Sequence, residues 1–152
     1  MSFMMVKKEF KLVGLKGSGE FVNFGNLVPL LAKQLLSRSN EILNPTETEI
    51  ALFEPKMDEE HRIGHYYVGL IVSEKLNEVP TGMNYIEINK SYITTRGNIS
   101  NLGDLHLNLL NWGKEKGYQR DLDSYIIETY YPMGEGDEEV QIYLPIQAYK
   151  TN

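Results

Sequence analysis

The amino-acid sequence contains no cysteine, which excludes disulfide bonds, cysteine-ligated zinc, iron–sulfur clusters and thiol catalysis. It also contains no apolar run close to the roughly 18 residues that a membrane-spanning helix requires. The N-terminal segment, MSFMMVKKEF, lacks the apolar stretch of a signal peptide. We therefore expect a cytoplasmic protein without a membrane partner.

Basic residues are outnumbered by acidic ones. The 15 Lys and Arg residues against 21 Asp and Glu residues give a net charge of −6, and the basic residues form no cluster. Nucleic-acid binding requires a basic face that neutralises phosphates, so we expect no direct nucleic-acid partner. Tyrosine, in contrast, is abundant, with ten residues. Such an excess suits an aromatic pocket or a partner surface, although tyrosine is also common in strands.

The 152 residues are typical of one domain, which we expect to span residues 1–152. Its two halves show the same order of signals, strand–helix–strand–strand. Repeat one covers about residues 8–74, a connection with Pro80 and Gly82 covers about 75–84, and repeat two covers about 85–148. The expected strands are residues 9–15, 49–54, 62–73, 85–96, 125–131 and 140–147.

Each half also contains an amphipathic pattern that predicts one helix. The first helix begins after Asn26, its expected N-cap, with Pro29 in the first turn. The second runs from about residue 102 to 116, between Asn101 as N-cap and Gly117 as stop signal. The residues expected on the inner faces are Leu27, Leu30, Leu31, Leu35, Leu102, Leu105, Leu109 and Trp112. This order predicts an α+β fold in which duplicated βαββ repeats form one antiparallel sheet with both helices on one face.

Metal and cofactor motifs are absent or incomplete. His61 and His65 have a spacing that brings two ligands together only on a helix, whereas their segment is typical of a loop and a strand. The glycines at 14 and 19 lie at the distance of a phosphate-binding loop, but Glu20 and Phe21 stand where lysine and serine or threonine are required. His106 shares the apolar face of the second helix, and we expect it to be half-buried. We therefore expect neither a metal nor a cofactor.

The most informative residue is Glu128. Strand periodicity places it on one face with Ile126 and Tyr130, and a carboxylate among such neighbours is costly when buried without a partner. One interpretation is a solvent-exposed side chain on an open sheet face. The other is a carboxylate at the floor of an aromatic pocket, which would bind lipophilic cations through charge pairing and cation–π contacts.

Glu128 and Tyr130 are therefore the first candidate ligand-binding residues. Further aromatic residues are candidates for the walls of this pocket. They are Tyr66, Tyr67, Tyr92 and Trp112.

Four ordered segments resemble the GyrI-like small-molecule-binding family, the effector-binding domain of AraC-type and MerR-type multidrug regulators. The first is Tyr67-Val-Gly-Leu70 followed by Val79-Pro-Thr-Gly-Met83. The second is the strand at residues 88–97, and the third is the helix at 109–117 with its Trp and Gly. The fourth is the Glu-x-Tyr strand at 127–130 followed by the proline-containing strand at 140–146. Together they cover roughly residues 8–148.

This resemblance implies a duplicated βαββ fold with a ligand cleft between the repeats and Glu128 as the pocket carboxylate. We expect no helix-turn-helix head, so the favoured function is stand-alone binding of hydrophobic, cationic small molecules. Two alternatives stay open. One is a small hydrolase with Glu128 as general base, which is less favoured because no second acid shares its strand face and no nucleophile is evident. The other is an interaction module with a protein partner, as the gyrase-inhibiting relative implies.

Overall fold

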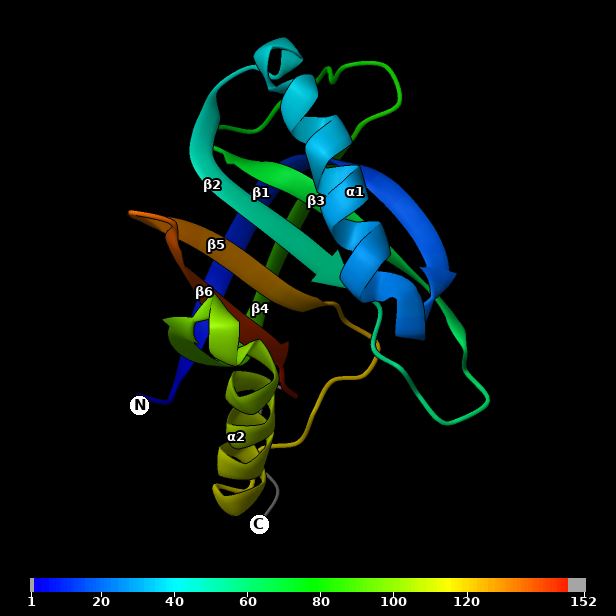
Figure 1. The fold of residues 1–152 in the computed structure, drawn as a ribbon. Helices are drawn as coiled ribbons and strands as arrows, with labels where there is room; N and C mark the ends of the chain where they lie inside the picture. Colours follow the sequence, from blue (N-terminus) through cyan, green and yellow to red (C-terminus); the bar gives the residue numbers. More distant parts are fainter. Residues whose placement is uncertain (1, 148–152) are drawn as a thin grey trace.

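The computed structural model describes residues 2–147, which form six strands and two helices (Figure 1). In chain order these are β1 (Met4–Glu20), α1 (Phe24–Ser37), β2 (Pro45–Phe53), β3 (Ile63–Val72), β4 (Asn84–Asn98), α2 (Leu102–Glu115), β5 (Ile126–Gly134) and β6 (Asp137–Pro145). The expected order, strand–helix–strand–strand, thus occurs twice. Neither helix of the described part is long and apolar enough to cross a membrane.

All strand pairs are antiparallel, and the single sheet closes into a barrel in the order β1-β3-β2-β5-β6-β4. Strand β1 closes it. Its residues 4–14 pair with β4, and its residues 12–20 pair with β3. One antiparallel sheet was predicted and is confirmed, but its closure was not predicted. The expected first strand, residues 9–15, covers only the middle of β1 and misses most of its pairing with each neighbour.

The barrel interior is filled by a cluster that contains no helix residue. Its buried members are Phe10, Leu12, Ile50, Leu52, Tyr92, Ile127 and Tyr143. The ring of Phe10 meets the rings of Tyr92 and Tyr143 edge to face, at centroid distances of 5.7 and 5.0 Å. The inner sheet face is therefore a second hydrophobic core rather than a solvated surface.

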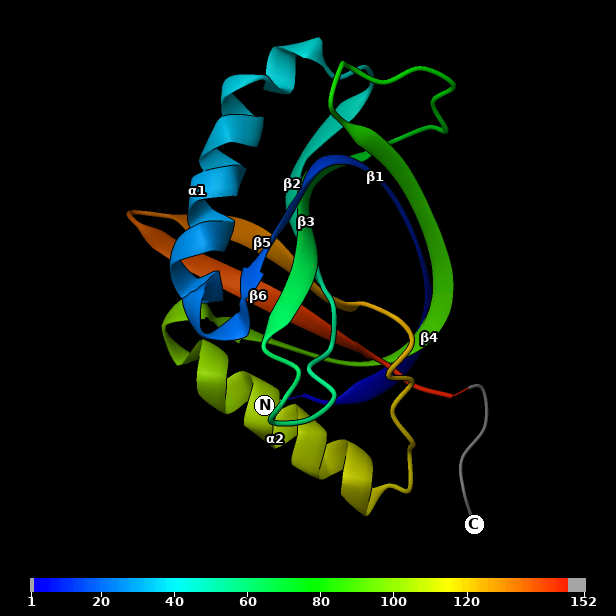
Figure 2. The same cartoon turned by 90° about the vertical axis from the view of Figure 1, so that its right-hand side faces the viewer.

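Both helices pack on the outer face of the barrel, as predicted. Leu35 of α1 joins buried residues of β1, β2 and β3, whereas Leu105 and Leu109 of α2 join buried residues of β4 and β6. Figures 1 and 2 show the two helices as separate covers over different parts of the sheet. Because β2 and β5 are neighbours in the sheet order, they lie between the two covers.

The boundaries of α2 agree with the prediction, with Asn101 before it and Gly117 after it at a φ of 80°. The start of α1 does not agree, because this helix begins at Phe24 and includes Pro29. Its inner face also differs, since Leu30 is 61% exposed. The side chains that pack inward from α1 are Val28, Leu31, Ala32 and Leu35, which follow the i, i+3, i+4, i+7 spacing of one helical stripe.

Candidate functional site

A cavity of about 580 Å³ lies between α1 and α2, above β2 and β5. This volume is within the range of small-molecule sites, about 300–1,000 Å³. Residues of both halves of the chain line it. They are Phe21, Phe24, Gly25, Val28, Pro29, Ala32, Leu35, Glu49, Ile50, Ala51, Phe53, Glu54, Lys56, Val68, Gly69, Ile99, Leu102, His106, Ile126, Glu128, Tyr130 and Glu138.

The floor of the cavity consists of three cross-strand pairs between β2 and β5. These pairs are Glu49 with Tyr130, Ala51 with Glu128, and Phe53 with Ile126. Alternate strand residues face the same side, and all six line the cavity. One end of the floor is therefore polar and the other end is aromatic and apolar. Between them, the small side chain of Ala51 leaves space beside the carboxylate of Glu128.

Glu128 is only 6% exposed, and each of its carboxylate oxygens has a partner. The hydroxyl of Tyr130 donates to Oε1 over 2.6 Å, and Nε2 of His106 lies 2.7 Å from Oε2. His106 belongs to α2, so this contact ties the helix to the sheet across the cavity. The two contacts hold the carboxylate at a fixed place in the floor.

The polar end of the cavity is negatively charged. Burial raises the pKa of Tyr130 well above its ordinary value, and the charges of Glu128, Glu138 and Glu49 raise it further. The phenol is therefore neutral and acts as a hydrogen-bond donor. Burial also raises the pKa of Glu49, with a further contribution from the charge of Glu138.

The opposite end of the cavity is built from aromatic rings. Phe24, the first residue of α1, lies 5.0 Å from Phe21 and 6.2 Å from Phe53 between ring centroids. Tyr66 packs edge to face on Phe24 at 4.9 Å, so it supports this wall from behind. Exposed faces of such rings attract cations through their quadrupoles.

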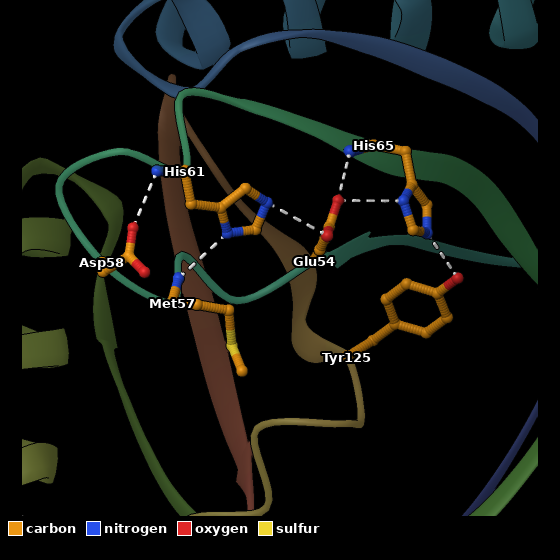
Figure 3. A network of polar contacts seen from close by, with 6 residues as sticks. All are labelled: Glu54, Met57, Asp58, His61, His65 and Tyr125. Carbon is orange, nitrogen blue, oxygen red and sulfur yellow. Dashed lines mark hydrogen bonds and ion pairs between the residues drawn. The ribbon is translucent and has the colours of Figure 1, made fainter.

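The connection after β2 closes the aromatic end and is fixed by a polar network (Figure 3). The carboxylate of Glu54 lies between two imidazoles, 3.0 Å from Nδ1 of His65 and 3.2 Å from Nε2 of His61. It also accepts the backbone N–H of His65, while Nε2 of that ring lies 2.7 Å from the hydroxyl of Tyr125. Burial alone would raise the pKa of Glu54, but the His65 N–H and the two imidazoles lower it. The two histidines thus hold a loop in place.

The cavity contains two of the six residues singled out in the sequence, Glu128 and Tyr130. The other four do not line it. Tyr66 is buried behind Phe24, and Tyr67 and Tyr92 pack with the cluster inside the barrel. Trp112 stacks between Phe3 and Tyr118, at centroid distances of 5.6 and 5.9 Å. Barrel closure explains why Tyr67 and Tyr92 lie away from the cavity, because it gives the sheet a second buried face.

Several lining residues were missed in the sequence. Glu49 and Phe53 lie on one face of a predicted strand, so their period-2 spacing was a usable signal. His106 follows Leu102 by one helical turn and was assigned only a structural place. Phe21 and Phe24 carried little signal, because α1 starts earlier than its leucine pattern indicates.

No family model matches the chain, and no curated protein matches it. Solved structures do match. The C-terminal domain of EcmrR has a TM-score of 0.64 and 15% identity, covering 97% of this chain and 99% of that domain. In an EcmrR–DNA complex the match has a TM-score of 0.66 and 14% identity, covering 95% of this chain and 57% of the EcmrR chain.

Two further structures have the same fold. An integron cassette protein from Vibrio cholerae has a TM-score of 0.62 and 10% identity, covering 95% of each chain. A hydrolase from Listeria innocua has a TM-score of 0.56 and 10% identity, covering 95% of this chain and 91% of its own. At these identities the likeness concerns the fold alone.

Proposed function

We propose that the protein is a ligand-binding module of the GyrI-like type, which binds a lipophilic cation in the cavity between α1 and α2. The observation that carries this proposal is a carboxylate, Glu128, that is 6% exposed at the floor of an aromatic cavity of about 580 Å³. A buried carboxylate is costly unless it is paired. A cation in the cavity would add a positive charge to the two contacts that Tyr130 and His106 already make with this carboxylate. The rings of Phe21, Phe24 and Phe53 would contact the apolar part of the cation.

The fold supports this proposal. The likeness to the C-terminal domain of EcmrR extends over nearly the whole chain. EcmrR itself is seen in a complex with DNA. The order strand–helix–strand–strand occurs twice, and each half contributes one helix and one floor strand to the cavity. We infer a duplicated βαββ fold whose ligand cleft lies between the repeats. On this proposal the protein senses or sequesters its ligand.

A second candidate function is hydrolysis. The imidazole of His106 lies 2.7 Å from Glu128 inside the cavity, and such a pair can accept a proton from a water molecule that attacks a bound electrophile. The likeness to the Listeria innocua hydrolase favours the same function at the level of the fold. Turnover of a panel of activated esters and epoxides, abolished in His106→Ala, would support hydrolysis over binding.

Calorimetric titration with tetraphenylphosphonium and the neutral triphenylphosphine oxide tests the binding proposal. Glu128→Gln keeps the shape of the side chain and removes its charge. We expect this variant to lose about 30-fold or more in affinity for the cation, because truncating one partner of a buried charge pair costs about 2 kcal/mol or more. Affinity for the neutral compound should change by less than about threefold, a limit of about 0.7 kcal/mol.

Glu115→Gln is the matched control, because it removes the same charge from an exposed position at the end of α2. It should leave both affinities unchanged. Equal losses for the cation and the neutral compound in Glu128→Gln would show that the charge of Glu128 does not act on the ligand, and would refute the proposal.

A further inference from the structure

The negatively charged residues next to Glu128 are not distributed evenly over the cavity. Glu49 lies in the floor pair at the polar end, opposite Tyr130. Glu138 comes from β6, two residues before Val140, which pairs with Tyr130 from the other side. Three adjacent strands therefore bring two carboxylates to the two sides of one phenol.

The spacing between this acidic end and Glu128 is fixed by the sheet. Glu128 pairs with Ala51, and Glu49 lies two residues before Ala51 on the same strand. Glu49 is thus the diagonal neighbour of Glu128, and such neighbours lie about 7–8 Å apart. The two acidic positions are close enough for one small molecule to reach both.

The carboxylates of Glu49 and Glu138 are not compensated within residues 2–147. No ion pair or side-chain hydrogen bond of the described residues involves either of them, whereas Glu128 and Glu54 are both bonded. The lining residue Lys56 comes three residues after Phe53, the last residue of β2, and therefore lies toward the aromatic end, away from Glu49. The lack of a nearby positive charge also agrees with the raised pKa of Glu49, because burial and the charge of Glu138 both raise it and no cation lowers it.

We propose that the ligand of this cavity is an amphiphilic dication, with one positive group at Glu128, a second between Glu49 and Glu138, and an apolar group against Phe21, Phe24 and Phe53. This inference rests on the proposed function and narrows its ligand class. An alkyl diamine or bis-amidine with a short spacer and one aromatic substituent has this chemistry. The polar and apolar ends of the floor fix its direction in the cavity.

The test compares two synthetic amines that differ in charge. N-(1-naphthylmethyl)butylamine carries one positive charge, and N-(1-naphthylmethyl)-1,4-diaminobutane carries two on the same frame. We expect the wild-type protein to bind the diamine about tenfold more tightly, because a partly desolvated ion pair exceeds the 0.2–1 kcal/mol of an exposed one. Glu49→Gln and Glu138→Gln should each reduce this ratio by about threefold or more, an effect within the range of a single ion pair.

The control is again Glu115→Gln, which removes one negative charge as the other two substitutions do and should keep the tenfold ratio. Equal binding of the two amines by the wild-type protein would refute the inference, as would a ratio that Glu49→Gln and Glu138→Gln leave unchanged. The proposed function fails in a different way, namely if Glu128→Gln changes the affinity for neither amine. Because the wild-type ratio requires no variant, the result does not depend on whether each substitution folds.

Discussion

Removing the hydroxyl of Tyr130 isolates the contact that holds Glu128 in the cavity floor. Tyr130→Phe keeps the ring and deletes a donor that lies 2.6 Å from Oε1 of a carboxylate with 6% exposure. The carboxylate then keeps His106 as a partner and loses its phenol partner. Because its surroundings on β2 and β6 are apolar or negatively charged, no side chain of the floor can replace the donor.

A hydrogen bond to a charged group contributes about 1.5–3 kcal/mol, so we expect the free energy of unfolding to fall by about this amount. For a chain of this length, the corresponding decrease in Tm is roughly 3–12 °C. Urea denaturation followed by circular dichroism at pH 7, without ligand, measures the change in the free energy of unfolding. The affinity for tetraphenylphosphonium should change by less than about fivefold, about 1 kcal/mol, since the charge of Glu128 stays in place.

Tyr85→Phe is the matched control. The hydroxyl of Tyr85 donates to Glu87 over 3.0 Å, but this pair is exposed on β4, and surface substitutions of this kind change stability by less than about 0.5 kcal/mol. Equal stability of Tyr130→Phe and the wild-type protein would refute the reasoning, because it would mean that Glu128 does not need the phenol. Equal destabilisation by both substitutions would refute the assigned role of burial.

Two further predictions concern stability. The pKa of Glu49 is raised in the folded protein by burial and by the charge of Glu138, so its contribution to stability is present below the unfolded pKa and is lost as the pH rises through the folded pKa. Glu49→Gln should therefore raise Tm at pH 7–8 but not near pH 4. A similar gain in Tm near pH 4 would contradict a raised pKa of Glu49. Tyr92→Phe removes a buried hydroxyl that has no hydrogen-bond partner among residues 2–147, so it should leave the free energy of unfolding unchanged or raise it by about 1 kcal/mol, and a loss of that size in urea denaturation would show that the hydroxyl is satisfied.

The local elements could be predicted because their signals are local. The positions of the strands follow from alternation, and Pro55 correctly predicts the end of β2. Gly97 and Pro132 do not end their strands, because β4 and β5 continue through them. Helix α2 follows from its leucines and from Gly117. The face shared by Ile126, Glu128 and Tyr130 could also be predicted, because period-2 alternation within one strand needs no distant partner. The partners of Glu128 could not, since His106 approaches it from another element.

Closure of the barrel could not be predicted from the same patterns. It depends on the antiparallel pairing of β1 with β4, from Met4 opposite Thr94 to Gly14 opposite Asn84, and no local signal encodes a partner that is so distant in the sequence. Strand β1 does carry one local feature that agrees with closure. Phe10, Leu12 and Val13 are all buried, which breaks strict alternation and is typical of a strand covered on both faces.

The cavity is a consequence of this topology rather than of any single residue. Helix α1 connects β1 to β2 but packs on β1 and β3, and α2 connects β4 to β5 but packs on β4 and β6. The strands that follow the two helices in the chain, β2 and β5, pair with each other and lie between the areas that the helices cover. In this chain the arrangement leaves a gap over this strand pair. The side chains then determine its chemistry, and here Glu128 and Glu49 bring two carboxylates into its floor while the small side chain of Ala51 keeps it open.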